Sequence, residues 1–114
     1  MVKLAAAASF TYQNTPVCFF GHTHVPVAFI RYDNQVRGGT YSKFRVEPGR
    51  KYFVNVGAVG QPRDGNPKSA YVVYDMDEGS IELRRLDYDI AAAQKKIIDA
   101  GLPPRLADRL AVGK

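Results

Sequence analysis

Short apolar runs rich in β-branched and aromatic residues alternate with turn signals along most of this chain. Runs of this length and composition are typical of β-strands, and clusters of Gly, Pro, Asn and Asp mark the turns between them. We predict strands over residues 17–20, 25–32, 35–38, 41–46, 51–56, 70–75 and 80–87. Two hairpin tips are predicted, one at Asp33-Asn34 and one at Met76–Gly79.

The two ends of the chain have helical patterns. An alanine-rich stretch near residues 2–11 predicts a helix followed by a Pro-marked loop, and we prefer this to a secretory signal peptide because the apolar part is mostly alanine. Asp89 predicts the N-cap of a second helix, which Gly101 ends. Pro103-Pro104 predicts the start of a third, short helix. The apolar faces of the last two helices are predicted to be Ile90, Ala93, Ile97 and Ile98, and then Leu106 and Leu110.

Both histidines of the chain lie on Gly21-His22-Thr23-His24, between the predicted strands 17–20 and 25–32. On extended backbone, side chains two positions apart point to the same side. We expect Gly21 to permit a sharp turn there, because glycine adopts a positive φ without steric cost. His22 and His24 can then bind one metal ion together or one each. Because a metal site usually needs about three or four ligands, the alternative is a surface turn in which backbone and water satisfy both rings.

The second motif is the glycine-rich stretch 55–67, which follows the predicted strand 51–56. Gly57 and Gly60 allow close approach of the backbone, and free amides in such a loop can face a phosphate. Arg63 can bind the same anion through two parallel hydrogen bonds. The alternative is a plain turn closed by an Arg–Asp pair within residues 61–65. The residues alone leave both interpretations open.

Composition indicates a globular chain of one domain at most, with 114 residues, 46% hydrophobic and 24% charged. The net charge of +5 comes from 16 basic and 11 acidic residues that are scattered along the chain. It suits solubility, or attraction for phosphate-bearing substrates or nucleic acid, and charge alone does not separate these. The single cysteine, Cys18, excludes an intrachain disulfide, and no apolar stretch is long enough to span a membrane. We expect a cytoplasmic protein.

Gly21-His22-Thr23-His24-Val25-Pro26 and the loop 55–67 together resemble the C-terminal part of the calcineurin-like metallophosphoesterases, specifically the small bacterial-type phosphoesterases. The similarity runs from about Val17 to the end of the chain, through residues 69–75, 86–90 and 101–110. The resemblance implies the α+β class and the C-terminal part of an αββα sandwich. This part would be mostly one mixed or antiparallel β-sheet with covering helices. Residues 1–114 would form a single partial domain.

The resemblance also implies a site. In that family the Gly-His-x-His motif binds a pair of divalent metal ions (Mn, Fe, Zn or Ni), so His22 would bind the second metal and His24 the first. The glycine-rich loop would lie near the metal centre, which gives Arg63, with Gly57 and Gly60, a substrate-binding role. The implied substrate is a phosphorylated small molecule or a phosphodiester, hydrolysed at the two-metal centre.

The sequence departs from the family pattern at two places. The family's earlier ligand motifs (Asp-x-His, Gly-Asp, Gly-Asn-His-Asp/Glu and a further lone His) do not occur in it, and Ala58 stands where the family often has Ser. We therefore expect weak metal binding and no appreciable turnover by this chain alone.

Two other functions stay open. A non-catalytic module would pair with a missing N-terminal half or form a homo-oligomer, because half of a sandwich exposes strand edges and apolar surface. A small nucleic-acid-binding protein would use the basic charge and stack bases on tyrosines. The tyrosines in question are Tyr41, Tyr52, Tyr71 and Tyr74. Their positions in strand patterns favour packing, so nucleic acid is the less favoured partner.

Overall fold

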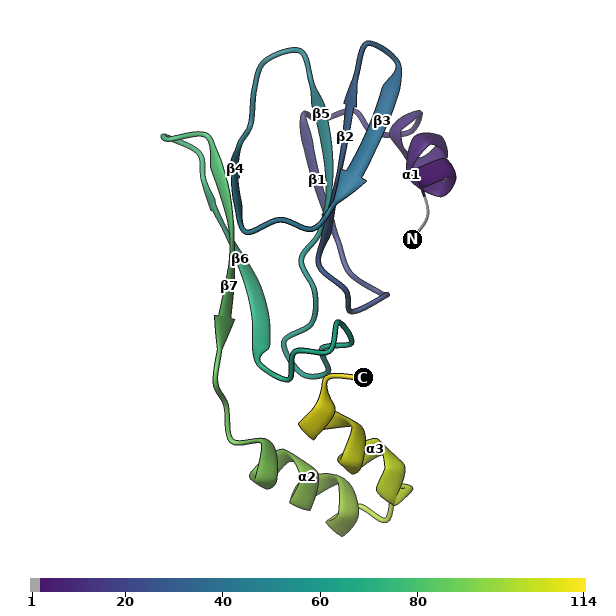
Figure 1. Cartoon of the computed structure of the whole chain (residues 1–114), viewed down its shortest axis with the longest axis vertical. Helices are drawn as coiled ribbons and strands as arrows, with labels where there is room; N and C mark the ends of the chain where they lie inside the picture. Colours follow the sequence, from purple (N-terminus) through teal and green to yellow (C-terminus); the bar gives the residue numbers. More distant parts are fainter. Residues whose placement is uncertain (1–2) are drawn as a thin grey trace.

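Two β-sheets and one helix form three layers in the upper part of the molecule, and two further helices extend below them (Figure 1). A computed structural model describes residues 3–114. The helices are α1 (Lys3–Phe10), α2 (Ile90–Asp99), α3 (Pro104–Asp108) and the short 3₁₀ helix η1 (Arg109–Val112). The strands are β1 (Val17–Phe20), β2 (Val27–Tyr32), β3 (Gln35–Gly39), β4 (Lys43–Arg45), β5 (Lys51–Asn55), β6 (Ser69–Asp75) and β7 (Ser80–Leu86). Each lies within a few residues of its predicted range.

The first sheet has the strand order β1-β5-β2-β3, and the second has the order β4-β7-β6. In the first sheet β1 runs parallel to β5, while β2 is antiparallel to both β5 and β3. The second sheet is antiparallel throughout. The α+β class is therefore confirmed. The strands divide between two sheets, where mostly one was expected, because β4 pairs with β7 and not with the strands that precede it.

Successive side chains of β5 point to opposite faces of the first sheet, as the two-residue period of a strand requires. Tyr52 and Val54 face the second sheet and pack in one buried cluster with Ala28 and Ile81. Phe53 points the other way, toward α1, with its ring 6.0 Å from that of Phe10. The opposite face of the first sheet thus packs against α1, which completes the three layers.

The hairpin tip at Asp33 and Asn34 is confirmed, since both residues have the positive φ (51° and 59°) that a tight two-residue turn needs. The N-cap of α2 is confirmed as well, because the Asp89 carboxylate accepts a hydrogen bond from the amide of Ala92 at 2.9 Å. Gly101 follows α2 with a φ of 75°. The predicted apolar face is wrong at Ile98, which is 48% exposed.

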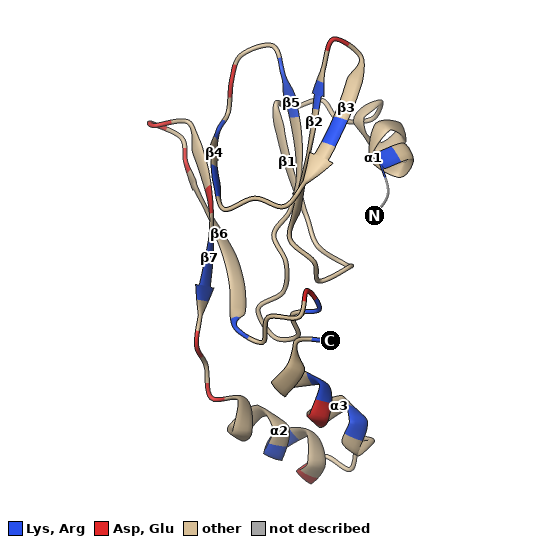
Figure 2. Ribbon diagram, viewed as in Figure 1, with Lys and Arg blue, Asp and Glu red and all other residues tan. Residues whose placement is uncertain are grey.

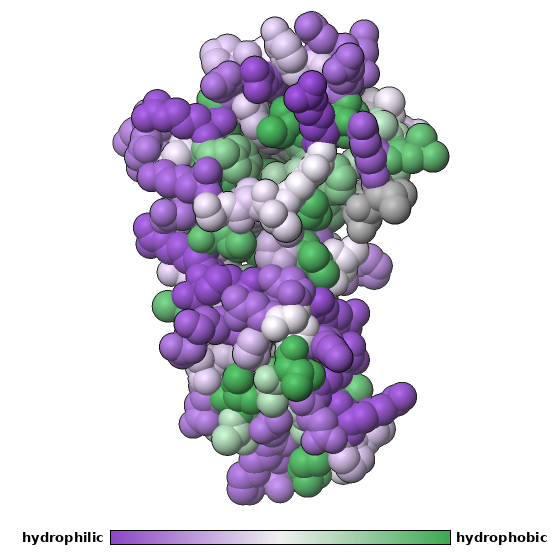
Figure 3. All heavy atoms as spheres, viewed as in Figure 1, coloured by the Kyte–Doolittle hydropathy of each residue, from purple (hydrophilic) through white to green (hydrophobic). Residues whose placement is uncertain are grey.

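The C-terminal helices do not cover a sheet. Within residues 3–114, α2 and α3 contact each other and η1 but no strand, so the expected covering role holds for α1 alone. Hydrophobic side chains are exposed over this lower end of the molecule (Figure 3), and they include Leu102 and Val112. The radius of gyration is 16.2 Å, whereas a compact domain of this length has about 13 Å. None of the helices in the described part is long and apolar enough to cross a membrane.

Candidate metal centre

The two motifs meet because they follow two parallel neighbouring strands. The histidine loop, residues 21–26, follows β1, and the glycine-rich loop follows β5. Phe20, the last residue of β1, is in register with Asn55, the last residue of β5. Beyond the strands the pairing continues, since the amide of Val56 donates to the carbonyl of Phe20 at 3.0 Å and the amide of Arg63 donates to the carbonyl of His24 at 3.1 Å. Functional residues commonly collect at this kind of edge in α/β sheets.

The histidine loop has an unusual backbone. His22 and His24 have φ values of 74° and 63°, in the left-handed region. The expectation of extended backbone there was wrong, and so was the expectation that Gly21 takes the positive φ. A non-glycine residue pays about 1–2 kcal/mol for this conformation. Such strain persists only where the surroundings hold it, and it concentrates at functional sites.

Asn55 holds the loop in this shape. The side chain is fully buried, and its amide donates to the Gly21 carbonyl at 3.1 Å and to the Thr23 hydroxyl at 2.7 Å. Its carbonyl oxygen accepts a hydrogen bond from the Gly57 amide at 2.9 Å. Sequence reasoning missed this residue, although a polar side chain ending an otherwise apolar strand is a signal that would have found it. Asn55 therefore ties both motifs into one unit.

His24 is oriented as a metal ligand would be. Its Nδ1 lies 2.8 Å from the Gln61 carbonyl oxygen. A carbonyl only accepts, so Nδ1 donates its proton, and in the neutral ring the lone pair is then on Nε2. Metal-binding histidines commonly have such a carbonyl partner, which fixes the ring and its tautomer. The His24 side chain is half-buried and that of His22 is exposed.

The donor set fits part of a metal site. Imidazole nitrogen suits Zn, Fe and Ni, and this loop offers two imidazoles. Within residues 3–114, however, there is no group of three or more His, Cys, Asp or Glu side chains that could hold a metal ion. The assignment of His22 and His24 as metal ligands stays a prediction.

The two glycines of the second motif differ in environment. Gly57 is buried with a φ of 80°, and a Cβ atom there would lie 2.9 Å from Pro26 Cγ and 3.0 Å from Ala70 Cβ. Gly60 is exposed and open space surrounds it. The geometry gives Gly57 a role in packing the loop and leaves the backbone of Gly60 accessible. Their contact with a substrate stays a prediction.

The Arg–Asp pair considered for residues 61–65 does not form within that loop. Arg63 is exposed and donates to the side chain of Gln61 at 2.9 Å. It lies on the wall of a cavity of about 530 Å³ between the glycine-rich loop and the C-terminal helices. Asp64 pairs instead with Arg85 of β7, through two hydrogen bonds of 2.7 and 3.2 Å.

Arg85 is a second residue that sequence reasoning missed. Besides Asp64, it binds the carbonyl oxygens of Asn66 and Lys68 at 2.9 and 2.8 Å. Burial by itself would raise the pKa of Asp64, but the hydrogen bonds and positive charge of Arg85, together with hydrogen bonds from the backbone amides of Asn66 and Asp64, outweigh it and lower that pKa. No local pattern could reveal this clamp, because its partners lie about 20 residues away along the chain.

One solved structure is similar to this chain over most of its length. The crystal structure of a metallophosphoesterase from Sphaerobacter thermophilus is similar with a TM-score of 0.83 and 37% sequence identity, over 96% of this chain and 48% of that one. The chain resembles the C-terminal part of a metallophosphoesterase. The resemblance inferred from the two motifs is thus confirmed.

A sequence relative is also matched over only part of its length. Uncharacterized protein MJ0912 of Methanocaldococcus jannaschii is 37% identical over 99 residues, which are 84% of this chain and 39% of that protein. No family model matches the chain. The chain thus spans less than half the length of both similar proteins.

Proposed function

We propose that this chain is the C-terminal portion of a metal-dependent phosphoesterase and supplies part of its metal and substrate site. The observation that carries the proposal is the joining of the histidine loop to the glycine-rich loop. Asn55 links the two through the Thr23 hydroxyl and the Gly57 amide, and Gln61 orients His24. The similarity to a metallophosphoesterase over 96% of the chain supports it.

We propose a role for each of the polar groups that this unit presents. His24 offers Nε2 to a metal, and His22 offers a second imidazole from the same loop. A bound pair of divalent metals would polarise the phosphoryl group and activate the attacking water. Arg63 and the open backbone at Gly60 lie on the adjoining loop, where they can bind phosphate oxygens of the substrate.

The rest of the site would come from outside this chain. Two imidazoles are fewer than the about three or four ligands that a metal site usually has. β1 and β6 are edge strands of the first and second sheets. These two edges lie on the same side of the molecule, because the rings of Phe19 on β1 and Tyr74 on β6 are 5.7 Å apart. An apolar cavity of about 230 Å³ lies there, and Val59 on its wall is 69% exposed. We propose that the remaining half of a complete metallophosphoesterase covers this edge, as a preceding stretch of chain or a partner.

Complementation tests the proposal. The half of the Sphaerobacter thermophilus enzyme that this chain does not match would be mixed with wild-type chain, His24→Gln or His22→Gln. Each mixture would be assayed with Mn²⁺ and bis(p-nitrophenyl) phosphate. We expect turnover only with both halves, and its loss in His24→Gln. Activity of the chain alone that depends on manganese and His24 would contradict the need for a second half. A stable complex without activity would favour the non-catalytic module.

The non-catalytic module is the second candidate, and the open edges of β1 and β6 favour it. Exposed strand edges and apolar surface promote pairing with another chain. This function predicts a dimer or larger assembly in solution. Light scattering that shows a stable monomer at tens of micromolar protein would count against it.

A further inference from the structure

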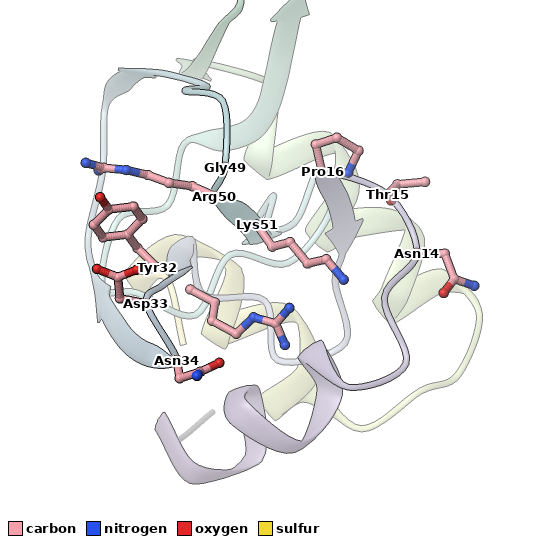
Figure 4. Close-up of a pocket in the computed structure, with 10 residues that line it drawn as sticks. Asn14, Thr15, Pro16, Tyr32, Asp33, Asn34, Gly49, Arg50 and Lys51 are labelled. Atoms are coloured by element: carbon pink, nitrogen blue, oxygen red, sulfur yellow. The ribbon is translucent and has the colours of Figure 1, made fainter.

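A third cavity, of about 510 Å³, lies at the far end of the first sheet from the histidine loop (Figure 4). It lies where β2 ends and β5 begins, next to the connection between α1 and β1. Figure 2 shows Lys and Arg at these ends of β2 and β5. The polar lining includes Asn14, Thr15, Arg31, Asn34, Arg50 and Lys51. The two-metal proposal uses none of these residues.

Arg31 and Lys51 form an uncompensated pair of cations in this cavity. They are directly opposite each other in the antiparallel register of β2 and β5, so their side chains leave the sheet side by side. Like charges in this arrangement are destabilising. Within residues 3–114, no acidic side chain lies within ion-pairing distance of either. Arg50, by contrast, lies 3.5 Å from Glu47.

Lys51 helps to cap the end of α1, but this contact uses only one of its hydrogen-bond donors. Lys51 donates one hydrogen bond to the Gln13 carbonyl, at 2.5 Å, out of the three that its ammonium group can make. The amides of residues 11, 12 and 13 already occupy the last carbonyls of the helix, at 3.1–3.3 Å. The Arg31 guanidinium lies 5.7 Å from the centre of the Phe10 ring, which positions it without using its N–H donors.

We propose that this cavity binds a small phosphorylated molecule through Arg31 and Lys51. Arg31 and Lys51 supply two positive charges that no acidic side chain within residues 3–114 pairs with, which suits a phosphate monoester that carries about −1.5 to −2 at pH 7. Asn14 and Thr15 line the cavity from the connection between α1 and β1 (Figure 4). The guanidinium of Arg50 points away from Lys51 (Figure 4), lies 4.7 Å from the centre of the Tyr32 ring and is paired with Glu47, so we do not count it in the site.

The test is a titration of the ¹⁵N-labelled chain with phenyl phosphate and with inorganic phosphate, followed by amide chemical shifts. EDTA is present throughout, so that no metal at His22 and His24 contributes and the result is independent of the proposed hydrolysis. We expect saturable shifts at the amides of Asn14, Thr15, Arg31 and Lys51. Arg31→Gln should weaken binding about tenfold, because a hydrogen bond to a charged group contributes about that factor. Lys51→Gln should do the same. Arg84→Gln is the matched control, since it removes the same charge from an exposed position on β7.

Three outcomes would overturn the proposal. The first is an unchanged affinity of Arg31→Gln for phenyl phosphate, which would exclude the proposed site even if Lys51→Gln fails to fold. The second is an equal loss in Arg84→Gln, which would mean attraction to net charge only. The third is tighter binding of a single-stranded oligonucleotide than of phenyl phosphate, with a steep salt dependence, which would make this surface a nucleic-acid interface.

Discussion

The side-chain amide of Asn55 donates a hydrogen bond to the hydroxyl of Thr23 at 2.7 Å, between the two histidines of the loop. This contact spans 32 residues of sequence, and it explains how His22 and His24 keep positive φ values. Strained conformations of this kind persist only where the surrounding structure holds them. The shape of the candidate metal centre thus depends on a residue that would never touch the metal.

Asn55→Ala should lower the free energy of unfolding by about 2–4 kcal/mol, because it removes the three hydrogen bonds of a fully buried side chain and leaves their partners unsatisfied. Urea denaturation followed by circular dichroism measures this. Asn14→Ala, at an exposed position, is the control and should change stability by less than about 0.5 kcal/mol. Equal stability of Asn55→Ala and wild type would show that Asn55 does not hold the loop.

Gly57→Ala and Gly60→Ala should differ in their effect on the free energy of unfolding. At Gly57 an added Cβ atom meets Pro26 and Ala70 within 3.0 Å on a backbone with φ of 80°, so we expect a loss of about 2–3 kcal/mol. At Gly60 the space is open, and alanine should be neutral or slightly stabilising, by up to about 1 kcal/mol. Thermal unfolding of both variants distinguishes the structural glycine from the accessible one.

Arg85→Met should loosen the glycine-rich loop, because it removes the hydrogen bonds to Asp64 and to two backbone carbonyls. We expect faster hydrogen exchange in residues 57–68 and a loss of about 1–3 kcal/mol in stability. Arg84→Met, on the same strand but exposed, is the control. If exchange in the loop were unchanged in Arg85→Met, the clamp would have no role in ordering it.

The same pair predicts an acid dependence. Because the pKa of Asp64 is lowered in the folded state, its contribution to stability is present above its ordinary pKa, about 4, and is lost as pH falls below that value. Arg85→Met should remove this part of the pH dependence. Denaturation at pH 7 and at pH 3 would show a smaller difference for Arg85→Met than for the wild type. An equal difference would exclude the pair as its source.

Tyr41 predicts a loss of stability in alkali. Burial raises its pKa to about 12, and its hydroxyl donates to the Asn55 carbonyl at 2.8 Å. The unfolded chain therefore loses this proton first, and stability falls as pH rises from about 10 to 12, by roughly 1 kcal/mol after allowance for solvent screening of a half-buried ring. Tyr41→Phe should lack this component, and Tyr12→Phe, at an 86% exposed ring, should keep it. Denaturation at pH 9 and pH 11 compares them.

The sequence by itself determined the elements and the two motifs. Strand ranges, the Asp33-Asn34 tip and the Asp89 cap depend on neighbours in the chain, through side-chain period, turn conformation and capping, so a local pattern contains them. The resemblance to a metallophosphoesterase depended on two short stretches, 21–26 and 55–67, and the comparison of structures agrees with it. What these motifs bind remained a hypothesis.

The tertiary structure alone decided how these pieces join. The parallel pairing of β1 with β5, the transfer of β4 to a second sheet and the clamp of Arg85 on Asp64 join residues about 20 to 40 positions apart. The positive φ of both histidines could not be predicted from the sequence, since glycine was available at position 21; at His22 it closes a turn in which the Thr23 amide donates to the Gly21 carbonyl at 2.9 Å. The hydrogen bonds that the buried Asn55 side chain makes to Gly21 and Thr23 hold the loop in that conformation. A buried polar group needs hydrogen-bond partners, and only the packed fold determines which groups lie close enough to serve.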